Sequence, residues 1–301
     1  MEHKLYLIDG MSIAFRMYYA MAQNNLTNKN NEPTGAIFGF ANMITTFLEK
    51  LTPVNIAVCF DCKAKTFRHK LYPEYKANRT EFPDDLGVQL PYIKQFLDFI
   101  GINRVEIPGY EADDIIGTYS KDASRSGMEI FCWTNDKDFY QILDKNTNII
   151  RNNKEKGNGN FEIIKLNDVK KIFGVEADEV VDYLALIGDS SDNIPGIKGI
   201  GKKTAIPLIE KYKTIENIYE NIEKIDKPRI KKLLQEGKNN AFLSKTLVTI
   251  DKNVPIENDY TTLKRKTVNY MDLDSFFSYL GLQQLRERWL YNKNIQILII
   301  I

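Results

Sequence analysis

The sequence predicts an α/β fold in which a mostly parallel central sheet is flanked by helices and followed by a helical subdomain. Two observations support this prediction. In residues 1–166, short apolar runs alternate with segments of helical apolar spacing, which is typical of a parallel sheet covered on both faces. From residue 167 onwards the pattern predicts short helices. The 301 residues suffice for one large domain or two smaller ones.

Four buried strands are expected in the first half, at residues 4–8, 54–60, 103–107 and 128–133. Helices are expected at residues 11–22, 34–51, 86–100 and from Glu111 to about residue 126. The clearest is 34–51, where Ile37, Phe40, Ile44 and Phe47 recur at helical spacing. Polar stretches at 24–33 and 152–160 predict loops, the second a hairpin or a disordered tip, and residues 247–250 predict one more strand.

Acidic residues follow the predicted strands. Asp9, Asp61 and Asp136 each come just after a strand, and Glu111 follows the third strand by a few residues. In parallel sheets, functional residues collect outside the carboxyl ends of the strands. We therefore expect four acidic sites, distant in sequence, to meet at one edge of the sheet.

Three carboxylates crowd the start of one predicted helix, at Glu111, Asp113 and Asp114. A single acid suits a helix N-terminus, but three repel one another unless a cation screens them. The sequence has only two histidines, so hard cations bound through oxygen, two Mg²⁺ or Mn²⁺, are expected. The candidate metal-binding acids are Asp9, Asp61, Glu111, Asp113, Asp114, Asp136, Asp138, Asp189 and Asp192.

Two segments are candidates for holding a phosphate backbone. Residues 63–79 interleave six basic residues with Phe67, Tyr72 and Tyr75, which suits nucleic acid, although a solvated basic loop explains this segment about equally well. Further on, a glycine turn between two predicted helices exposes backbone N–H groups and precedes a helix N-terminus. We interpret this turn as part of a helix-hairpin-helix motif that binds the DNA backbone without contacts to the bases. Its candidate residues are Lys198, Gly199, Gly201, Lys202, Lys203 and Thr204.

The amino-acid composition excludes fewer classes of function than the motifs do. The net charge is +1, and hydrophobic and charged contents of 43% and 27% are ordinary for a globular protein. Three cysteines, an odd number, favour a reducing compartment over a disulfide framework. Neither a signal peptide, a Walker loop nor a Ser-His-Asp pattern is apparent, and the apolar stretch 295–301 is too short to span a bilayer.

The motifs together resemble those of the 5′-nuclease family, which includes flap endonucleases and the N-terminal domain of bacterial DNA polymerase I. The resemblance runs from about Lys4 to Asp251 and rests on LIDG, FRHKLYPEYKANR, PGYEADD, TNDKDFYQ and LIGDSSDNIPGIKGIGKKTA. It implies a PIN-like fold and a metal-dependent 5′-3′ exonuclease or flap endonuclease of replication and repair. It leaves open whether the chain is a stand-alone nuclease or a domain of a longer DNA polymerase I.

The resemblance also implies roles for the residues. Asp9, Asp61, Glu111 and Asp113 would hold a first metal, and Asp136, Asp138 and Asp192 a second, with Asp113 between them. Asp114 and Asp189 would act through neighbouring ligands. Arg68, Lys76 and Arg79 would form the catalytic basic side of an arch, residues 63–85, with Tyr75 stacking on a base. A K⁺ ion would sit at the hairpin.

The expected organisation is a nuclease core at 1–166, a helical subdomain at 167–260 and a C-terminal segment at 261–301. In that last segment Phe276, Phe277, Leu280, Leu282, Leu285 and Trp289 predict an apolar helical face that packs on the core. Expected partners are 5′-ended or branched duplex DNA, 5′ flaps and RNA primers, for a monomer of the bacterial cytoplasm without membrane attachment. The alternative is a DNA-binding module of the same fold that lacks turnover; a small-phosphate hydrolase would leave the hairpin and the basic segment unexplained.

Overall fold

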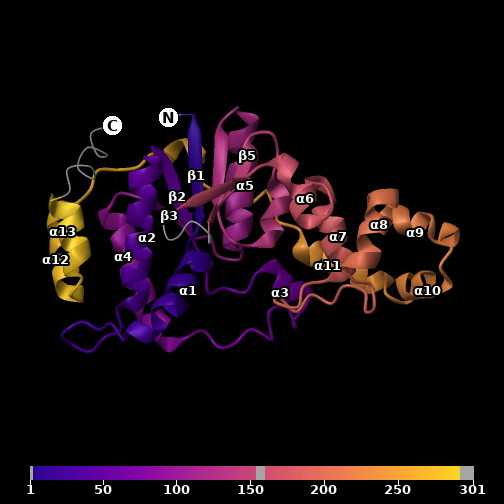
Figure 1. Ribbon diagram of the computed structural model, residues 1–301, viewed down its shortest axis with the longest axis horizontal. Helices are drawn as coiled ribbons and strands as arrows, with labels where there is room; N and C mark the ends of the chain where they lie inside the picture. The colour runs from indigo at the N-terminus through magenta and orange to yellow at the C-terminus, as the bar shows by residue number, and fades with distance from the viewer. Residues whose placement is uncertain (1–2, 154–159, 292–301) are drawn as a thin grey trace.

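The computed structural model describes residues 3–153 and 160–291. A six-stranded sheet lies at its centre, in the order β3-β2-β1-β4-β5-β6 (Figure 1). Neighbouring strands are parallel except β6, which runs antiparallel to β5. The strands are β1 (Lys4–Asp9), β2 (Asn55–Cys59), β3 (Asn103–Val105), β4 (Glu129–Trp133), β5 (Thr147–Asn152) and β6 (Phe161–Ile164).

The α/β prediction and its four strands are confirmed to within two residues at each end. Two strands were missed, β5 and β6. They form an antiparallel pair, and β5 offers only Ile149 and Ile150 as an apolar run, too short to suggest a strand. Most of the loop predicted at 152–160 lies outside the described residues. The strand predicted at 247–250 is wrong, because helix α11 (Lys238–Val248) continues through its first half.

Alternate residues of the strands face two separate cores. Tyr6, Ile8 and Val58 belong to one core, which α1 (Gly10–Met21), α2 (Gly35–Leu51) and α4 (Asp84–Phe99) cover. Leu5 and Leu7 belong to the other core, which α5 (Ala112–Arg125) covers. The period of two is the ordinary consequence of strand geometry. Because both faces are covered, only the strand ends remain for a site.

The helical subdomain continues the core beneath α5 and extends away from the sheet, to the right in Figure 1. Helix α7 packs against both α11 and α8. The subdomain contains α6 (Val169–Phe173), α7 (Val180–Ile187), α8 (Lys202–Tyr212), α9 (Ile215–Glu220), α10 (Pro228–Glu236) and α11. Short 3-10 helices occupy Ala22–Asn24, Lys137–Ile142, Leu166–Asp168, Ala177–Glu179, Ile222–Lys224 and Tyr260–Thr262.

The C-terminal helices α12 (Tyr270–Leu280) and α13 (Gln283–Tyr291) lie at the opposite end of the molecule from α8–α10 (Figure 1). Their apolar face is buried against α2 and α4, and Trp289 donates a hydrogen bond to Thr45 at 2.8 Å. The tail at 295–301 lies outside the described residues. No helix in the described part of the chain is long and apolar enough to cross a bilayer.

Candidate metal centre and DNA interface

A cleft of about 310 Å³ opens at the carboxyl edge of the sheet, where five of the nine predicted acids meet. Side chains from the end of β1, from the segments that follow β2 and β4, and from the starts of α1 and α5 line it, together with two cations of the basic segment (residues 63–85). The strands bring these residues together because their ends share one edge. The lining consists of Asp9, Met11, Ser12, Phe15, Asp61, Lys76, Arg79, Glu111, Asp113, Asn135 and Asp136.

Asp9 connects the sheet to the first helix. It is the N-cap of α1, accepting a hydrogen bond from the Ser12 N–H at 2.9 Å, and the Thr134 hydroxyl donates to its other oxygen at 3.1 Å. These bonds orient the carboxylate at the floor of the cleft. Burial raises the pKa of Asp9 to about 7, and the charges of Asp61 and Asp136 add to that rise.

The start of α5 supplies the next acids. Glu111 is the N-cap of α5, and Asp113 lies in its first turn. Asp61, two residues after the end of β2, accepts a hydrogen bond from the Ala112 N–H at 2.8 Å, which fixes the helix start against the sheet. The pKa of Asp113 is well above its ordinary value, through burial and then the charge of Asp136. Such crowding of carboxylates is stable only when a cation or protons offset it.

A second group of acids adjoins the first through Asp136. Asp136 caps a 3-10 helix by accepting from the Asp138 N–H at 2.9 Å. Burial and the charges of Asp136 and Asp189 raise the pKa of Asp138 well above its usual value. Its Oδ1 is buried with no hydrogen-bond partner among the described residues. Asp189 is paired with Lys137 at 3.0 Å, and Asp192 is drawn towards the basic segment.

Two cations of the basic segment occupy the cleft. The Lys76 Nζ lies 2.9 Å from Glu111 Oε1 and 3.7 Å from Asp192 Oδ2, while Arg79 pairs with Asp192 at 2.5 Å. Burial would lower the pKa of Lys76, but Glu111 and Asp192 outweigh it and raise the pKa. Lys76 has a φ of +58°, an unusual conformation for a residue with a side chain, and its N–H donates to the Asp192 carbonyl. The basic segment is thus docked on the 190–193 turn of the helical subdomain.

Tyr75 was predicted to stack on a base, and the structure turns its hydroxyl towards two of the acids. Its side chain is only 4% exposed, so neither face of the ring is open to a base. Its hydroxyl lies 3.1 Å from Glu111 Oε2 and 3.3 Å from Asp192 Oδ2. Tyr75 therefore bridges one carboxylate from each group.

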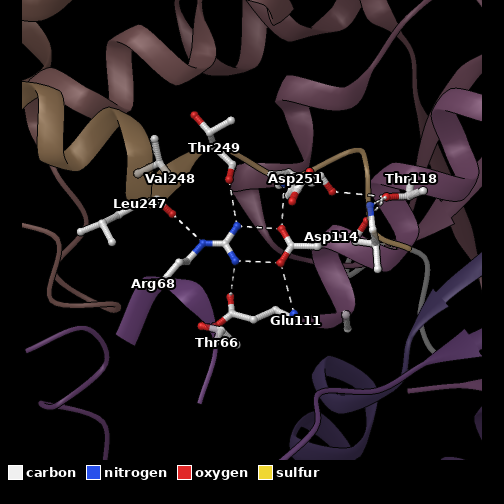
Figure 2. Close-up of polar contacts among 12 residues, drawn as sticks. Thr66, Arg68, Glu111, Asp114, Thr118, Leu247, Val248, Thr249 and Asp251 are labelled. Carbon is white, nitrogen blue, oxygen red and sulfur yellow. Dashed lines mark hydrogen bonds and ion pairs between the residues drawn. The ribbon is translucent and has the colours of Figure 1, made fainter. Parts of the chain in front are cut away.

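The structure places two further predicted residues outside the cleft. Arg68, predicted to act catalytically at the arch, is buried at 2% exposure. Asp114, a candidate metal acid expected to act through neighbouring ligands, is fully buried and accepts a hydrogen bond from the Glu111 N–H at 3.2 Å. The two residues form a bidentate ion pair with each other, at 2.7 and 2.8 Å (Figure 2). The sequence pattern could not distinguish these buried charges from the exposed ones beside them.

The donor set suits hard divalent ions. Five of the eleven residues that line the cleft are carboxylates, whose oxygens Mg²⁺ and Mn²⁺ prefer. Asp138, which contacts Asp136, adds a carboxylate oxygen with no hydrogen-bond partner among the described residues. Within residues 3–153 and 160–291, no three His, Cys, Asp or Glu side chains already form a metal cage. Glu111 and Asp192 are turned towards Lys76, Tyr75 and Arg79.

The hairpin (residues 196–204) has the expected turn. Gly199 adopts a φ of +91°, while a Cβ built at Gly201 would meet no atom within 4 Å. Lys198, Lys202 and Lys203 are exposed, and Thr204 is half-buried. Lys202 and Lys203 are the first two residues of α8, where backbone N–H groups have no acceptor within an α-helix. This surface can accept phosphate groups.

Sequence reasoning missed the residues that orient the acids. Thr134 and Ser12 hold Asp9, and Asn135 lines the cleft beside them. Thr134 also accepts a hydrogen bond from the Asp136 N–H at 3.0 Å, so one hydroxyl links two of the acids. The sequence did offer a signal for Thr134, because this residue lies between the end of β4 and the acid Asp136.

Comparisons with known proteins agree with this geometry. A family model described as "5'-3' exonuclease, N-terminal resolvase-like domain" matches residues 4–174, and one described as "5'-3' exonuclease, C-terminal SAM fold" matches residues 175–271. A 5′-3′ exonuclease of Aquifex aeolicus is 38% identical over 283 residues, 93% of each chain. DNA polymerase I of Caldicellulosiruptor bescii is 41% identical over 292 residues, 94% of this chain and 34% of that protein. The chain thus spans about a third of the DNA polymerase I relatives that it matches.

Solved structures share the fold. The T5 5′-exonuclease with bound zinc has a TM-score of 0.64 at 18% identity, over 99% of both chains. The catalytic core of Rad2 in complex with a DNA substrate has a TM-score of 0.62 at 18% identity, over 98% of this chain and 92% of that one. At such identity the likeness concerns the fold alone.

Proposed function

Because this chain belongs to the 5′-3′ exonuclease family, we propose that it is a structure-selective, metal-dependent nuclease that hydrolyses phosphodiester bonds near 5′ ends and at 5′ flaps of DNA. The observation that carries the proposal is the meeting of five carboxylates and two cations in one cleft. The carboxylates can bind metal, and the cations can attract the phosphate of a substrate.

We assign the metals by this chain's own residues. Asp9, Asp61, Glu111 and Asp113 would hold one ion, and Asp136, Asp138 and Asp192 a second. When bound, such ions supply a water of lowered pKa and stabilise the leaving oxygen. Asp114 is excluded, because four donors already use its carboxylate.

The cations have a separate role in this proposal. Lys76 and Arg79 face the cleft from the basic segment, where they can contact the phosphate to be cut. Positive charge aimed at a phosphate is most valuable as negative charge develops in the transition state. The hairpin lysines would hold the downstream duplex through its backbone, which explains binding without base contacts.

Four further parts of the proposal are inferred from the family resemblance alone. They are Mg²⁺ or Mn²⁺ as the ions, a K⁺ ion at the hairpin, RNA primers as well as DNA as substrates, and action as a monomer in the bacterial cytoplasm. The similarity to DNA polymerase I of Caldicellulosiruptor bescii supports a location with the chromosome.

The test uses a labelled 5′-flap duplex with Mg²⁺, and then with chelator. We expect metal-dependent cutting that Asp136→Ala abolishes while flap binding is largely kept, because the phosphate-binding cations remain. Asp122→Ala, a change at an exposed acid of α5 outside the cleft, is the control. Binding without cutting by the unaltered chain would instead favour the DNA-binding module; near-normal cutting by Asp136→Ala would remove that residue from the metal site.

A further inference from the structure

A buried polar network joins three parts of the chain that are distant in sequence (Figure 2). Its centre is the ion pair of Arg68, from α3 (Phe67–Leu71), and Asp114, from the first turn of α5. The third part is the end of α11 with the segment that follows it, residues 247–254, which we call the strap.

Arg68 binds the strap as well as Asp114. Its Nε donates to the Leu247 carbonyl at 2.9 Å and its Nη2 to the Thr249 carbonyl at 2.8 Å. Carbonyls at a helix C-terminus have no partner within the helix and carry partial negative charge. The guanidinium therefore caps α11 and holds it against the nuclease core.

Asp114 completes the joint from the other side. Besides Arg68, it accepts hydrogen bonds from the Asp251 N–H at 2.8 Å and the Glu111 N–H at 3.2 Å. The strap also passes close over α5, since a Cβ built at Gly117 would lie 2.6 Å from Ile250. One carboxylate thus ties the strap to the backbone of Glu111, the acid that caps α5.

The same helix also contacts the hairpin. The Ser244 hydroxyl of α11 accepts a hydrogen bond from the Gly196 N–H at 3.0 Å, at the start of the hairpin. A Cβ built at Gly237, just before α11, would lie 2.6 Å from Ile197. Short contacts therefore run from the hairpin through α11 and Arg68 to the carboxylates of α5.

We propose that Arg68 and Asp114 are positioning residues that fix the hairpin relative to the cutting carboxylates, and so determine where a bound strand is cut relative to its duplex end. Both residues are buried and lie outside the cleft, so their effect on DNA is indirect. This inference rests on the proposed nuclease function and adds to it the origin of the cut position.

The test compares Arg68→Met with the double variant Arg68→Met/Asp114→Met. The single variant leaves a buried carboxylate unpaired, which can unfold the chain. In the double variant no buried charge is left unpaired, and such apolar replacements are often well tolerated. Lys70→Met, an exposed change on the same helix, is the matched control for lost positive charge.

Two measurements are made on the folded double variant. On a flap substrate we expect cutting spread over several positions and a single-turnover rate at least tenfold lower, with DNA affinity changed less than threefold. In metal-free protein we expect a broader distance distribution between spin labels at exposed positions 122 and 232, introduced as Asp122→Cys and Lys232→Cys in a Cys62→Ser background. Lys70→Met should match the unaltered chain in both.

The two readouts separate the proposals. If the unaltered chain cuts no flap, the proposed function fails, while the label distances still decide whether the joint orders the hairpin. Label distances as narrow in the double variant as in the unaltered chain would overturn the positioning role. A single unaltered cut position in the folded double variant would overturn it as well.

Discussion

Tyr75→Phe distinguishes a bridging hydroxyl from a stacking ring. The hydroxyl lies 3.1 Å from Glu111 and 3.3 Å from Asp192, and its one proton can serve only one of them at a time. A hydrogen bond to a charged group contributes about 1.5–3 kcal/mol. Because both distances exceed the usual O–H···O length, we expect the lower end, about 1.5 kcal/mol less unfolding free energy. For a chain of this size, that loss of stability lowers the melting temperature by about 2 °C.

The assay is thermal unfolding in chelator, paired with single-turnover cutting of a flap in Mg²⁺. The cutting rate should fall as well, since Glu111 and Asp192 lose the group that holds them together. Tyr72→Phe, a half-buried tyrosine of the same segment, is the control. If Tyr75→Phe behaves as the unaltered chain while Tyr75→Leu loses both stability and rate, the ring is what matters and the bridging argument is refuted.

Three other predictions concern charge and backbone. Lys76→Ala should lower the single-turnover rate far more than flap affinity, because Lys76 faces the cleft; equal losses would make it only part of the general attraction for DNA. Gly199→Val should lower both the melting temperature and the affinity for duplex DNA, because Gly199 has a φ of +91° that valine resists. Gly201→Val should lower the affinity alone, because Gly201 has a φ of −112° that valine can adopt. Unchanged DNA binding by Gly201→Val would show that no phosphate approaches Gly201. Burial alone would raise the pKa of Glu179, but its hydrogen bonds, first of all the one from Lys213, lower the pKa. The stability that Glu179 contributes is therefore present above its ordinary pKa of 4.5 and is lost as the pH falls below that value. In denaturation curves between pH 6 and pH 3, the unfolding free energy of Glu179→Gln should fall less steeply with decreasing pH than that of the unaltered chain, and equal slopes would contradict this prediction.

Local patterns carried the fold prediction a long way. The strands β1, β2 and β4 are short apolar runs that end near acids, and the helix 34–51 has a regular apolar face. Both patterns follow from side-chain geometry within a few residues. The pair β5 and β6 was missed because its strands are stabilised mainly by each other and by β4, which are contacts between segments.

The meeting of the acids at one edge was predictable from the order of strands and helices, because parallel strands place their carboxyl ends together. The sequence also indicated a glycine hairpin with lysines around it. The positions of Asp9, Asp61 and Asp136 in the site could be predicted without any knowledge of contacts between distant segments.

Which charges face the cleft depends on how distant segments pack together. Arg68 and Lys76 stand eight positions apart in one basic segment, yet one caps a helix 179 positions away and the other lines the cleft. Asp113 and Asp114 are adjacent, yet Asp114 is taken up by Arg68 and by the N–H of Asp251, 137 positions away. A charged side chain becomes structural when distant backbone groups satisfy it in the interior, and that depends on how the subdomains pack.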